Sequence, residues 1–220
     1  MRGIIIKSLD YKEKSKIVFI YTILGLKGYK VIGIKGKKNV VAGNLTTGNI
    51  IDFTYTDSQF PSLVEFDTIK SNLDCSNNFD TIDVLRVMIE VINYLPEDAP
   101  HKLMYQFIED AFMNILNINP YKVLSIFLIK MLYPFGVSPN LKSCSKCGKK
   151  TDLIGFSIVD GGALCNNCCS GYNDLLKYWS IYYYSKDNIL KLDDCNFKEL
   201  LKEINKYYLI NVHMNLKLHL

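Results

Sequence analysis

Four cysteines have the type and the spacing to bind a single metal ion. They form the pairs Cys144-x2-Cys147 and Cys165-x2-Cys168, which are separated by seventeen residues. Two C-x2-C turns with about 15 to 20 residues between them are typical of a four-thiolate zinc site. Zn²⁺ takes four thiolates tetrahedrally, and a site closed by four protein ligands leaves no position for a reacting water. The pattern therefore predicts one structural zinc ion.

The segment between the two pairs predicts a hairpin. Strand-forming residues at 156–159 and 163–164 flank the turn signal Asp-Gly-Gly at 160–162. Two cysteine turns joined through a hairpin are typical of a zinc ribbon. Cys169 adjoins Cys168, but the C-x2-C register favours Cys168 as the ligand.

Two disulfides or a redox-active pair are the alternatives to a metal. With Cys75, Cys169 and Cys195 the chain has seven cysteines, and an odd number does not suit a secreted disulfide framework. The apolar stretch at residues 3–6 ends at Lys7, so no signal-peptide pattern precedes the rest of the chain. No βαβ unit surrounds the cysteine pairs, as a thioredoxin-type redox site requires. We therefore expect metal binding.

Positive charge is concentrated near the N-terminus. Residues 1–40 carry ten basic and two acidic side chains, a net charge of +8, whereas the whole chain carries +4. Such an asymmetry indicates a polyanion-binding segment, although lysines that only solvate the outer faces of strands would have the same composition. The predicted DNA contacts are the lysines Lys12, Lys14, Lys16, Lys30, Lys35, Lys37 and Lys38.

Aromatic side chains stand among these lysines, at Tyr11, Phe19, Tyr21 and Tyr29. Single-strand binding uses this combination, because cations follow the phosphates and each base that stacks on a ring contributes about 1 to 3 kcal/mol. Strand alternation turns roughly half of such rings toward a core. One or two of the four are therefore expected to serve as stacking platforms.

The sequence lacks the motifs of common enzyme classes. It has no phosphate-binding P-loop, no G-x-G-x-x-G after a strand, no H-E-x-x-H and no G-x-S-x-G. No H-x-E accompanies the cysteines, as a zinc deaminase requires. We therefore expect a protein that is not an enzyme and has no small-molecule substrate.

The elements that must position these residues fall into two groups. Short strands are predicted at 3–9, 16–23, 29–35, 49–56 and 63–69, with glycine-rich turns at 24–28 and 36–39. Five such strands are typical of the OB-fold, a small barrel that is common on nucleic acids. Helical periodicity follows at 79–95, 98–117, 120–133, 172–184 and 197–208.

Two helix starts have a local signal, and one aromatic cluster is ambiguous. Asp98 can cap the second helix, and Asn119-Pro120 is typical of a helix start. The tyrosines at 182–184 suit either a stacking surface or ordinary packing. The chain is therefore predicted to be α+β, with an OB-fold β-barrel at residues 1–72 and an α-helical domain at 73–220. The helical domain carries the zinc-ribbon-like insertion at 142–170.

Composition agrees with a globular protein. The chain has 220 residues, of which 49% are hydrophobic and 12% aromatic, so it can build a substantial core. Its longest apolar runs, such as residues 123–129, are far shorter than the roughly 18 residues that cross a bilayer. We expect a soluble, cytoplasmic protein with no membrane partner.

Two sets of segments together resemble the bacterial RecO family of DNA repair proteins. The first set is DYKEKS at 10–15, LGLKG at 24–28 and IKGKK at 34–38. The second set is FGVSPNL at 135–141, the first cysteine pair, and FS and GGAL ahead of the second pair. The resemblance covers essentially the whole chain. Basic positions are almost all Lys here, whereas Arg is frequent in relatives.

The resemblance implies an OB-fold, a helical domain and a zinc-binding insertion in that domain, with the four cysteines as ligands. It implies a nucleoid-associated mediator of recombinational repair that binds single- and double-stranded DNA and anneals complementary strands. With the partner RecR, such a mediator loads recombinase onto DNA coated by single-strand binding protein. The basic residues from Lys12 to Lys38 would line the DNA face. A zinc-ribbon adaptor that binds proteins and an RNA-binding OB protein are the alternative functions.

Overall fold

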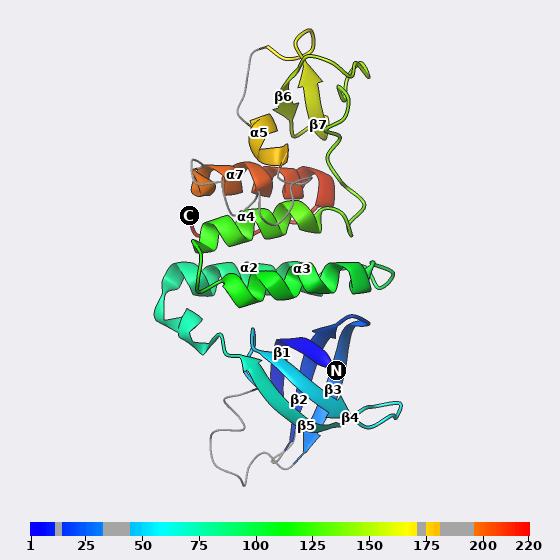
Figure 1. Cartoon of the computed structure of the whole chain (residues 1–220), viewed down its shortest axis with the longest axis vertical. Helices are drawn as coiled ribbons and strands as arrows, with labels where there is room; N and C mark the ends of the chain where they lie inside the picture. Colours follow the sequence, from blue (N-terminus) through cyan, green and yellow to red (C-terminus); the bar gives the residue numbers. More distant parts are fainter. Residues whose placement is uncertain (12–14, 33–44, 171–174, 181–195) are drawn as a thin grey trace. The chain divides into compact units, whose positions relative to one another are not determined.

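A five-stranded antiparallel sheet forms the first part of the computed structural model (Figure 1), which describes residues 1–11, 15–32, 45–170, 175–180 and 196–220. The strand order is β3-β2-β1-β4-β5. The backbone N–H of Lys30 donates to the carbonyl of Pro61 at 2.9 Å, so the outer strands also meet. This closure makes the sheet a five-stranded barrel of the OB type, as predicted. The strands are β1 (Arg2–Tyr11), β2 (Ser15–Thr22), β3 (Gly25–Ile32), β4 (Ile50–Tyr55) and β5 (Leu63–Lys70).

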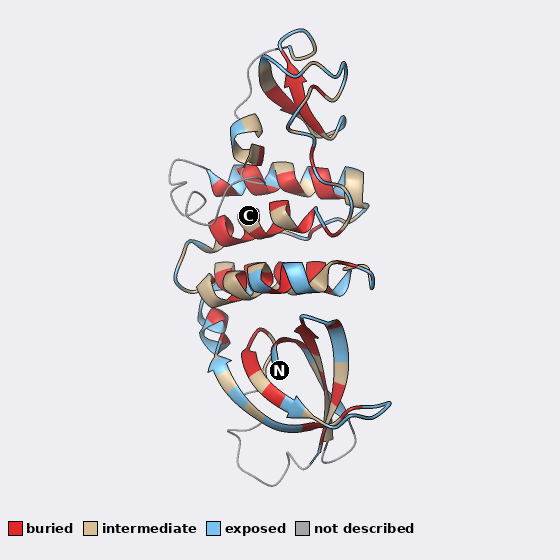
Figure 2. Cartoon of the chain, turned by 45° about the vertical axis from the view of Figure 1, so that its right-hand side comes forward, coloured by how far each residue is buried: buried red, intermediate tan, exposed pale blue. Residues whose placement is uncertain are grey.

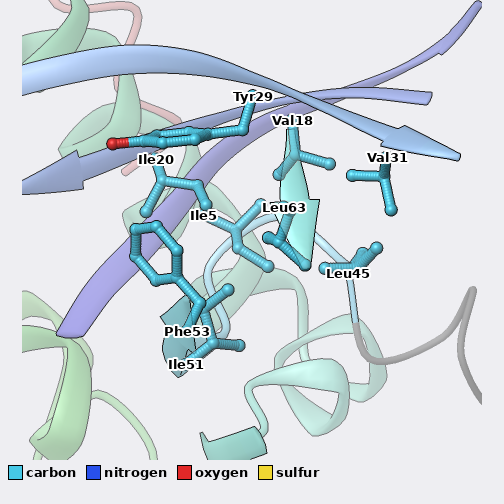
Figure 3. Close-up of a cluster of buried hydrophobic side chains, with 9 residues drawn as sticks. All are labelled: Ile5, Val18, Ile20, Tyr29, Val31, Leu45, Ile51, Phe53 and Leu63. Atoms are coloured by element: carbon cyan, nitrogen blue, oxygen red, sulfur yellow. The ribbon is translucent and has the colours of Figure 1, made fainter. Parts of the chain in front are cut away.

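The barrel interior is filled by alternate side chains of its strands. Figure 3 shows this core, and Figure 2 shows buried and exposed residues alternating along parts of the strands. The rings of Tyr29 and Phe53 meet edge to face, with centroids 5.1 Å apart, a geometry that stabilises aromatic pairs. The core consists of Ile5, Val18, Ile20, Tyr29, Val31, Leu45, Ile51, Phe53 and Leu63.

The hairpin between β2 and β3 is tighter than predicted. The glycine-rich turn expected at 24–28 is wrong, because Thr22 already pairs with Gly25 and only two residues connect the strands. Gly25 has φ +94°, a conformation that favours glycine. The Thr22 hydroxyl accepts from the N–H of Leu24 at 3.1 Å. Gly28 lies within β3, and the turn expected at 36–39 lies outside the described residues.

Two helices follow the barrel within the same compact unit, Met1–Pro120. The 3-10 helix η2 (Leu73–Asn77) leads into α2 (Phe79–Asn93). The side chain of Asn78 caps α2 by accepting from the N–H groups of Asp80 at 2.8 Å and Thr81 at 3.3 Å.

The next helix, α3 (His101–Asn114), begins later than predicted. Pro100 precedes its first residue, and no side chain caps this helix, so the expected role of Asp98 is wrong. The physical reason is Pro100, which disfavours helical geometry at the residue before it.

Specific contacts join the barrel to α3. The Tyr21 hydroxyl on β2 lies 3.1 Å from Nδ1 of His101, and its ring stacks on Tyr105. The side-chain amide of Asn72, which is 2% exposed, donates to the carbonyls of Gly48 at 2.8 Å and Phe112 at 3.2 Å. These hydrogen bonds join residues of the barrel segment to residues of α3, across the domain boundary predicted at residue 72. That boundary stays a prediction.

The second compact unit, Tyr121–Leu220, contains the remaining elements. Helix α4 (Pro120–Met131) starts at the predicted proline, and nearly all of its side chains are buried. The Tyr208 hydroxyl of the π-helix donates to the carbonyl of Leu128 at 2.8 Å. The other elements are β6 (Leu153–Ser157), β7 (Gly162–Cys165), α5 (Leu175–Trp179), α7 (Phe197–Tyr207) and the π-helix η4 (Tyr208–Val212).

The predicted helix at 172–184 is described only around α5, and the tyrosines at 182–184 lie outside the described residues. Across the described segments, no helix combines the length and the apolar character that a bilayer crossing requires.

Candidate metal centre and nucleic-acid interface

The structure brings the four predicted cysteines together. The Sγ atoms of Cys144, Cys147, Cys165 and Cys168 all lie within 4.8 Å of one another. Those of Cys147 and Cys165 are 3.6 Å apart. Four thiolates about 2.3 Å from one ion would be about 3.8 Å apart along the edges of a tetrahedron. This cysteine cluster therefore has the size of a zinc tetrathiolate site.

Backbone hydrogen bonds shape each C-x2-C pair into a turn. In the first pair the N–H of Gly148 donates to the carbonyl of Cys144 at 2.8 Å. In the second pair the N–H groups of Cys168 and Cys169 both donate to the carbonyl of Cys165 at 3.0 Å. These hydrogen bonds hold each pair in a turn, and both sulfurs of each turn reach the common cluster.

The hairpin joins the two cysteine turns. Strands β6 and β7 pair antiparallel, and Cys165 is the last residue of β7. The N–H of Ser145 donates to the carbonyl of Ala163 at 2.8 Å, which attaches the first turn to β7. The expected turn residue Gly162 belongs to the strand instead, and the loop comprises residues 158–161. Gly161 ends this loop with φ +68°.

Neighbouring groups change the pKa values of two of the thiols. Backbone N–H groups, first that of Cys165, donate to the Cys144 sulfur and lower the pKa of Cys144 to about 6. The hydrogen bond between Cys168 and Cys147, together with burial, raises the pKa of Cys168 to about 12. The pKa of one thiol is thus lowered while that of its neighbour is raised. A bound cation would keep both sulfurs as thiolates, because a coordinating thiol is deprotonated by the ion.

None of the cysteines that the structure describes is in a disulfide. The charged side chains beside the cluster are paired with one another. Lys149 lies 2.6 Å from Asp152, and Lys146 lies 3.6 Å from Asp160. Each of these two lysines therefore balances a neighbouring carboxylate, and we do not assign them to phosphate binding.

Three aromatic rings from β6, α5 and α7 pack against one another beside the hairpin. Phe156 of β6 stacks on Trp179 with centroids 4.5 Å apart and an interplanar angle of 6°. Trp179 also meets Tyr207 at 4.7 Å. The side-chain amide of Asn211 in the π-helix donates to the carbonyl of Ile158 at 3.2 Å. Trp179 is the single tryptophan of the chain, so its environment reports on this packing.

Two of the seven lysines predicted to contact DNA, Lys16 and Lys30, are described by the structure. Five lie outside the described residues: Lys12, Lys14, Lys35, Lys37 and Lys38.

The strand register separates the two described lysines. Lys30 pairs with Ile17, in a row of residues that alternates with the buried row containing Val18 and Tyr29. Lys30 therefore belongs to the outer face of the barrel. Lys16 pairs with buried Val31 and so belongs to a row that faces inward near the barrel's end, where its ammonium lies 3.5 Å from the Asp10 carboxylate.

The four candidate stacking rings also separate. Tyr21 and Tyr29 are 0% and 2% exposed and belong to the interior, so they cannot stack on bases. Tyr11 is 39% exposed. Phe19 is half-buried and pairs with Gly28 on one side and Lys7 on the other.

Phe19 lies over a glycine on the outer face. A Cβ atom at Gly28 would lie 3.3 Å from the Phe19 ring, so the ring packs directly over the glycine backbone. A bulge after Ile5 shifts the register of β1, so Lys7 pairs with Phe19 on this face. We call Lys7, Phe19, Gly28 and Lys30 the outer patch.

Sequence reasoning missed Lys7 and one further ring. Phe60 is 57% exposed in the connection between β4 and β5. Its neighbour Pro61 accepts the hydrogen bond from Lys30, so this loop lies beside β3. The loop between strands 4 and 5 is one of the ligand-binding loops of OB-folds. The signal was present, because Ser58-Gln59-Phe60-Pro61-Ser62 has turn composition and an aromatic residue there need not be core.

The fold and the cysteine cluster define a class: an OB-fold barrel followed by helices, with a zinc-ribbon-like hairpin. Comparison with known proteins identifies the family. The sequence model described as "Recombination protein O C terminal" matches residues 77–217. The chain therefore belongs to the RecO family of DNA repair proteins, and it is a recombination mediator, not an enzyme.

Curated relatives agree over most of the chain. A "DNA repair protein RecO" from Halalkalibacterium halodurans is 29% identical over 178 residues, covering 76% of this chain and 67% of that protein. One from Clostridium acetobutylicum is 29% identical over 213 residues, covering 91% and 85%. One from Bacillus mycoides is 24% identical over 227 residues, covering 94% and 90%.

Proposed function

We propose that this protein binds single- and double-stranded DNA with the outer patch and the adjoining lysine-rich segments, and that it anneals complementary strands. In this proposal it acts with RecR to help load recombinase onto DNA covered by single-strand binding protein. It works in the bacterial cytoplasm, at the nucleoid. Family membership supports the repair role, and the outer patch supports the binding mode.

The observation that supports the binding mode is that two lysines and an aromatic ring lie at outward-facing positions of the adjacent strands β1, β2 and β3. Lys7 and Lys30 offer two cations, and the half-buried ring of Phe19 lies over the backbone of Gly28 on the same face. Cations that follow phosphates and a ring that stacks on a base are what a single strand requires. The other predicted contacts, Lys12, Lys14, Lys35, Lys37 and Lys38, adjoin these strands in the sequence and lie outside the described residues.

The cysteine cluster is proposed to hold one structural Zn²⁺ with Cys144, Cys147, Cys165 and Cys168 as ligands. The cluster size and the absence of a disulfide among the described cysteines support this assignment. Four protein ligands leave no open coordination position. The ion would therefore stabilise the hairpin and take no part in DNA chemistry.

The test is a titration of a fluorescent single strand at several salt concentrations. We expect log affinity to fall linearly with log salt, and Lys30→Gln to reduce the slope by about 0.7, because one phosphate contact is lost. Lys202→Gln is the matched control, since Lys202 pairs with Glu199 on α7. An unchanged slope in Lys30→Gln would place the DNA contact elsewhere on the barrel.

Two further measurements separate the alternatives. Lys35→Glu combined with Lys37→Glu tests the predicted loop contact in the same assay. Competition between DNA and RNA of matched sequence distinguishes a DNA mediator from an RNA-binding OB protein. If neither nucleic acid binds at low salt, the zinc-ribbon adaptor is the better description.

A further inference from the structure

Exposure to solvent distinguishes one member of the cysteine cluster. Cys147 is exposed, Cys168 is half-buried, and Cys144 and Cys165 are 2% and 0% exposed. Among the four cysteine residues, Cys147 is therefore the one most open to a small reagent from solvent. Oxidation of cysteine follows exposure and thiolate character, and zinc ligands are thiolates.

A partner sulfur lies within reach of Cys147. The Cys165 Sγ is 3.6 Å away, so the two sulfurs must approach by about 1.5 Å to reach disulfide length. The turn that carries Cys147 ends at Gly148, which has φ +76°, and no atom lies within 4 Å of the position that a Cβ would take there, so this side of the turn is open.

A fixed cation lies near the same pair. Lys149 is held by Asp152 at 2.6 Å, and its backbone carbonyl accepts from the N–H of Cys144 at 2.7 Å, which attaches it to the first cysteine turn. An ammonium in this place can stabilise the negative charge that develops on an oxygen leaving from sulfur. The exposed sulfur, its close partner and the cation together make a site for thiol oxidation.

We propose that a hydroperoxide oxidises Cys147 and Cys165 to a disulfide, and that this reaction releases the metal ion from the cysteine cluster. The release part rests on the proposed zinc site, whereas the disulfide part rests on the sulfur geometry alone. The cluster is then a modification site that responds to peroxide and that is separate from the DNA-binding outer patch.

The reaction has two balanced steps. The Cys147 thiolate attacks the distal peroxide oxygen, the O–O bond breaks, and the sulfur becomes a sulfenic acid while hydroxide or alkoxide leaves. The Cys165 thiolate then attacks the Cys147 sulfur, the S–S bond forms, and the sulfenic oxygen leaves as hydroxide. Two thiolates lose two electrons, the hydroperoxide gains them, and two protons from the buffered solvent convert the leaving groups to water, or to one alcohol and one water. Two of four metal ligands are thereby lost.

The experiment exposes the full-length reduced protein to hydrogen peroxide. Metal release is followed with a chromogenic chelator, disulfides are mapped by peptide mass spectrometry, and the fluorescence of Trp179 reports on the hairpin. We expect the first disulfide to join Cys147 and Cys165, with release of one zinc ion per chain. Dithiothreitol with added zinc should reverse all three signals.

Two matched variants test which sulfur is attacked. Cys147→His keeps a zinc ligand but removes the exposed thiol, and we expect about tenfold slower release. Cys144→His makes the same exchange at a buried thiol, and it should release zinc at the wild-type rate. Equal rates in wild type and Cys147→His would overturn the proposal.

The disulfide map of the wild-type protein tests the proposal even if neither variant folds. A first disulfide within either C-x2-C pair in the wild-type protein would overturn the proposal. If the purified protein contained no zinc but still formed the Cys147–Cys165 bond, the proposed metal site would fail while the oxidation site would stand.

Discussion

Single residues decide which part of the barrel can meet a base. Phe19 and Tyr29 have similar sequence surroundings, yet Tyr29 is a core residue and Phe19 lies on the outer face next to Gly28. The difference follows from strand alternation, since Val18 and Ile20 on either side of Phe19 are buried. The proposed stacking platform is therefore Phe19, whereas Tyr21 and Tyr29 are buried and cannot stack on a base.

Phe19→Leu should weaken binding of a single strand by about 5- to 150-fold, because a stacked base contributes about 1 to 3 kcal/mol. Binding to duplex should change less, since its bases are already stacked on one another. Leucine keeps the apolar contact with the sheet, so stability should change little. Fluorescence anisotropy with both substrates makes this measurement.

The control for Phe19→Leu is Tyr94→Leu, which removes a 62% exposed ring at the end of α2. That variant should bind both substrates as wild type does. Equal losses for single strand and duplex in Phe19→Leu would contradict a stacking role.

Among the elements, the cysteine hairpin depends on a close approach of two backbones. Gly162 in β7 bridges to Asn140 in parallel fashion, and the N–H of Ala163 donates to the Asn140 carbonyl at 2.7 Å. A Cβ atom at residue 162 would overlap the Asn140 carbonyl oxygen and would lie 2.5 Å from the Ser145 hydroxyl. The glycine is therefore required by space, not by its φ angle.

Gly162→Ala should destabilise the hairpin by about 1 to 3 kcal/mol, the usual cost of overpacking where the backbone must move. Thermal unfolding monitored by Trp179 fluorescence measures the effect, because that ring stacks on Phe156 in β6. Val159→Ala in the hairpin loop is the control, and a 76% exposed side chain should matter by less than about 0.5 kcal/mol. Equal stability of the two variants would contradict the prediction, because the backbone would then accommodate a Cβ at residue 162 without a loss of stability.

Removal of the metal should loosen the hairpin and leave the barrel folded. The barrel has its own core, whereas the cluster's small core consists of Cys144, Leu164 and Cys165 with partly buried neighbours. We expect a strong chelator under reducing conditions to remove one zinc ion and to change Trp179 emission, with most secondary structure retained by circular dichroism. Protein that is purified under reducing conditions without zinc would contradict the metal assignment.

At the scale of the whole molecule, the barrel and the helices α2 and α3 belong to one compact unit that ends at Pro120. Tyr21 of the barrel is fully buried and contacts His101 and Tyr105 of α3. The Asn72 amide donates to the Phe112 carbonyl. A barrel cut at residue 72 would expose the Tyr21 ring to water and would lose the contacts of Tyr21 with His101 and of Asn72 with the Phe112 carbonyl; a typical intramolecular hydrogen bond contributes about 0.5 to 1.5 kcal/mol.

We therefore expect a fragment of residues 1–120 to unfold cooperatively with a higher midpoint than a fragment of residues 1–72. Urea titration monitored by circular dichroism compares the two fragments. Equal midpoints, or a stable 1–72 fragment with native-like chemical shifts, would support the domain boundary predicted from the sequence. His101→Ala in the longer fragment isolates the contribution of the Tyr21 contact.

Patterns with a short period or a fixed spacing were readable from the sequence. The five strands, the helix starts at Phe79 and Pro120, and the spacing of the cysteine pairs all depend on local chemistry, and the structure contains them. Predictions that depended on one competing residue failed. Pro100 moved the start of α3 away from Asp98, and Gly25 shortened the turn after β2.

The sequence by itself determined that the chain has a β-barrel, helices and a cysteine quartet, because repeating patterns and cysteine spacing express local preferences. Only the tertiary structure decided which faces these residues take. One bulge in β1 exchanges inside for outside, so Lys7 joins Phe19 on the outer face, and cross-strand pairing turns Lys16 toward the core row but Lys30 outward. Such choices depend on the register between paired strands, which the pattern within one strand does not contain.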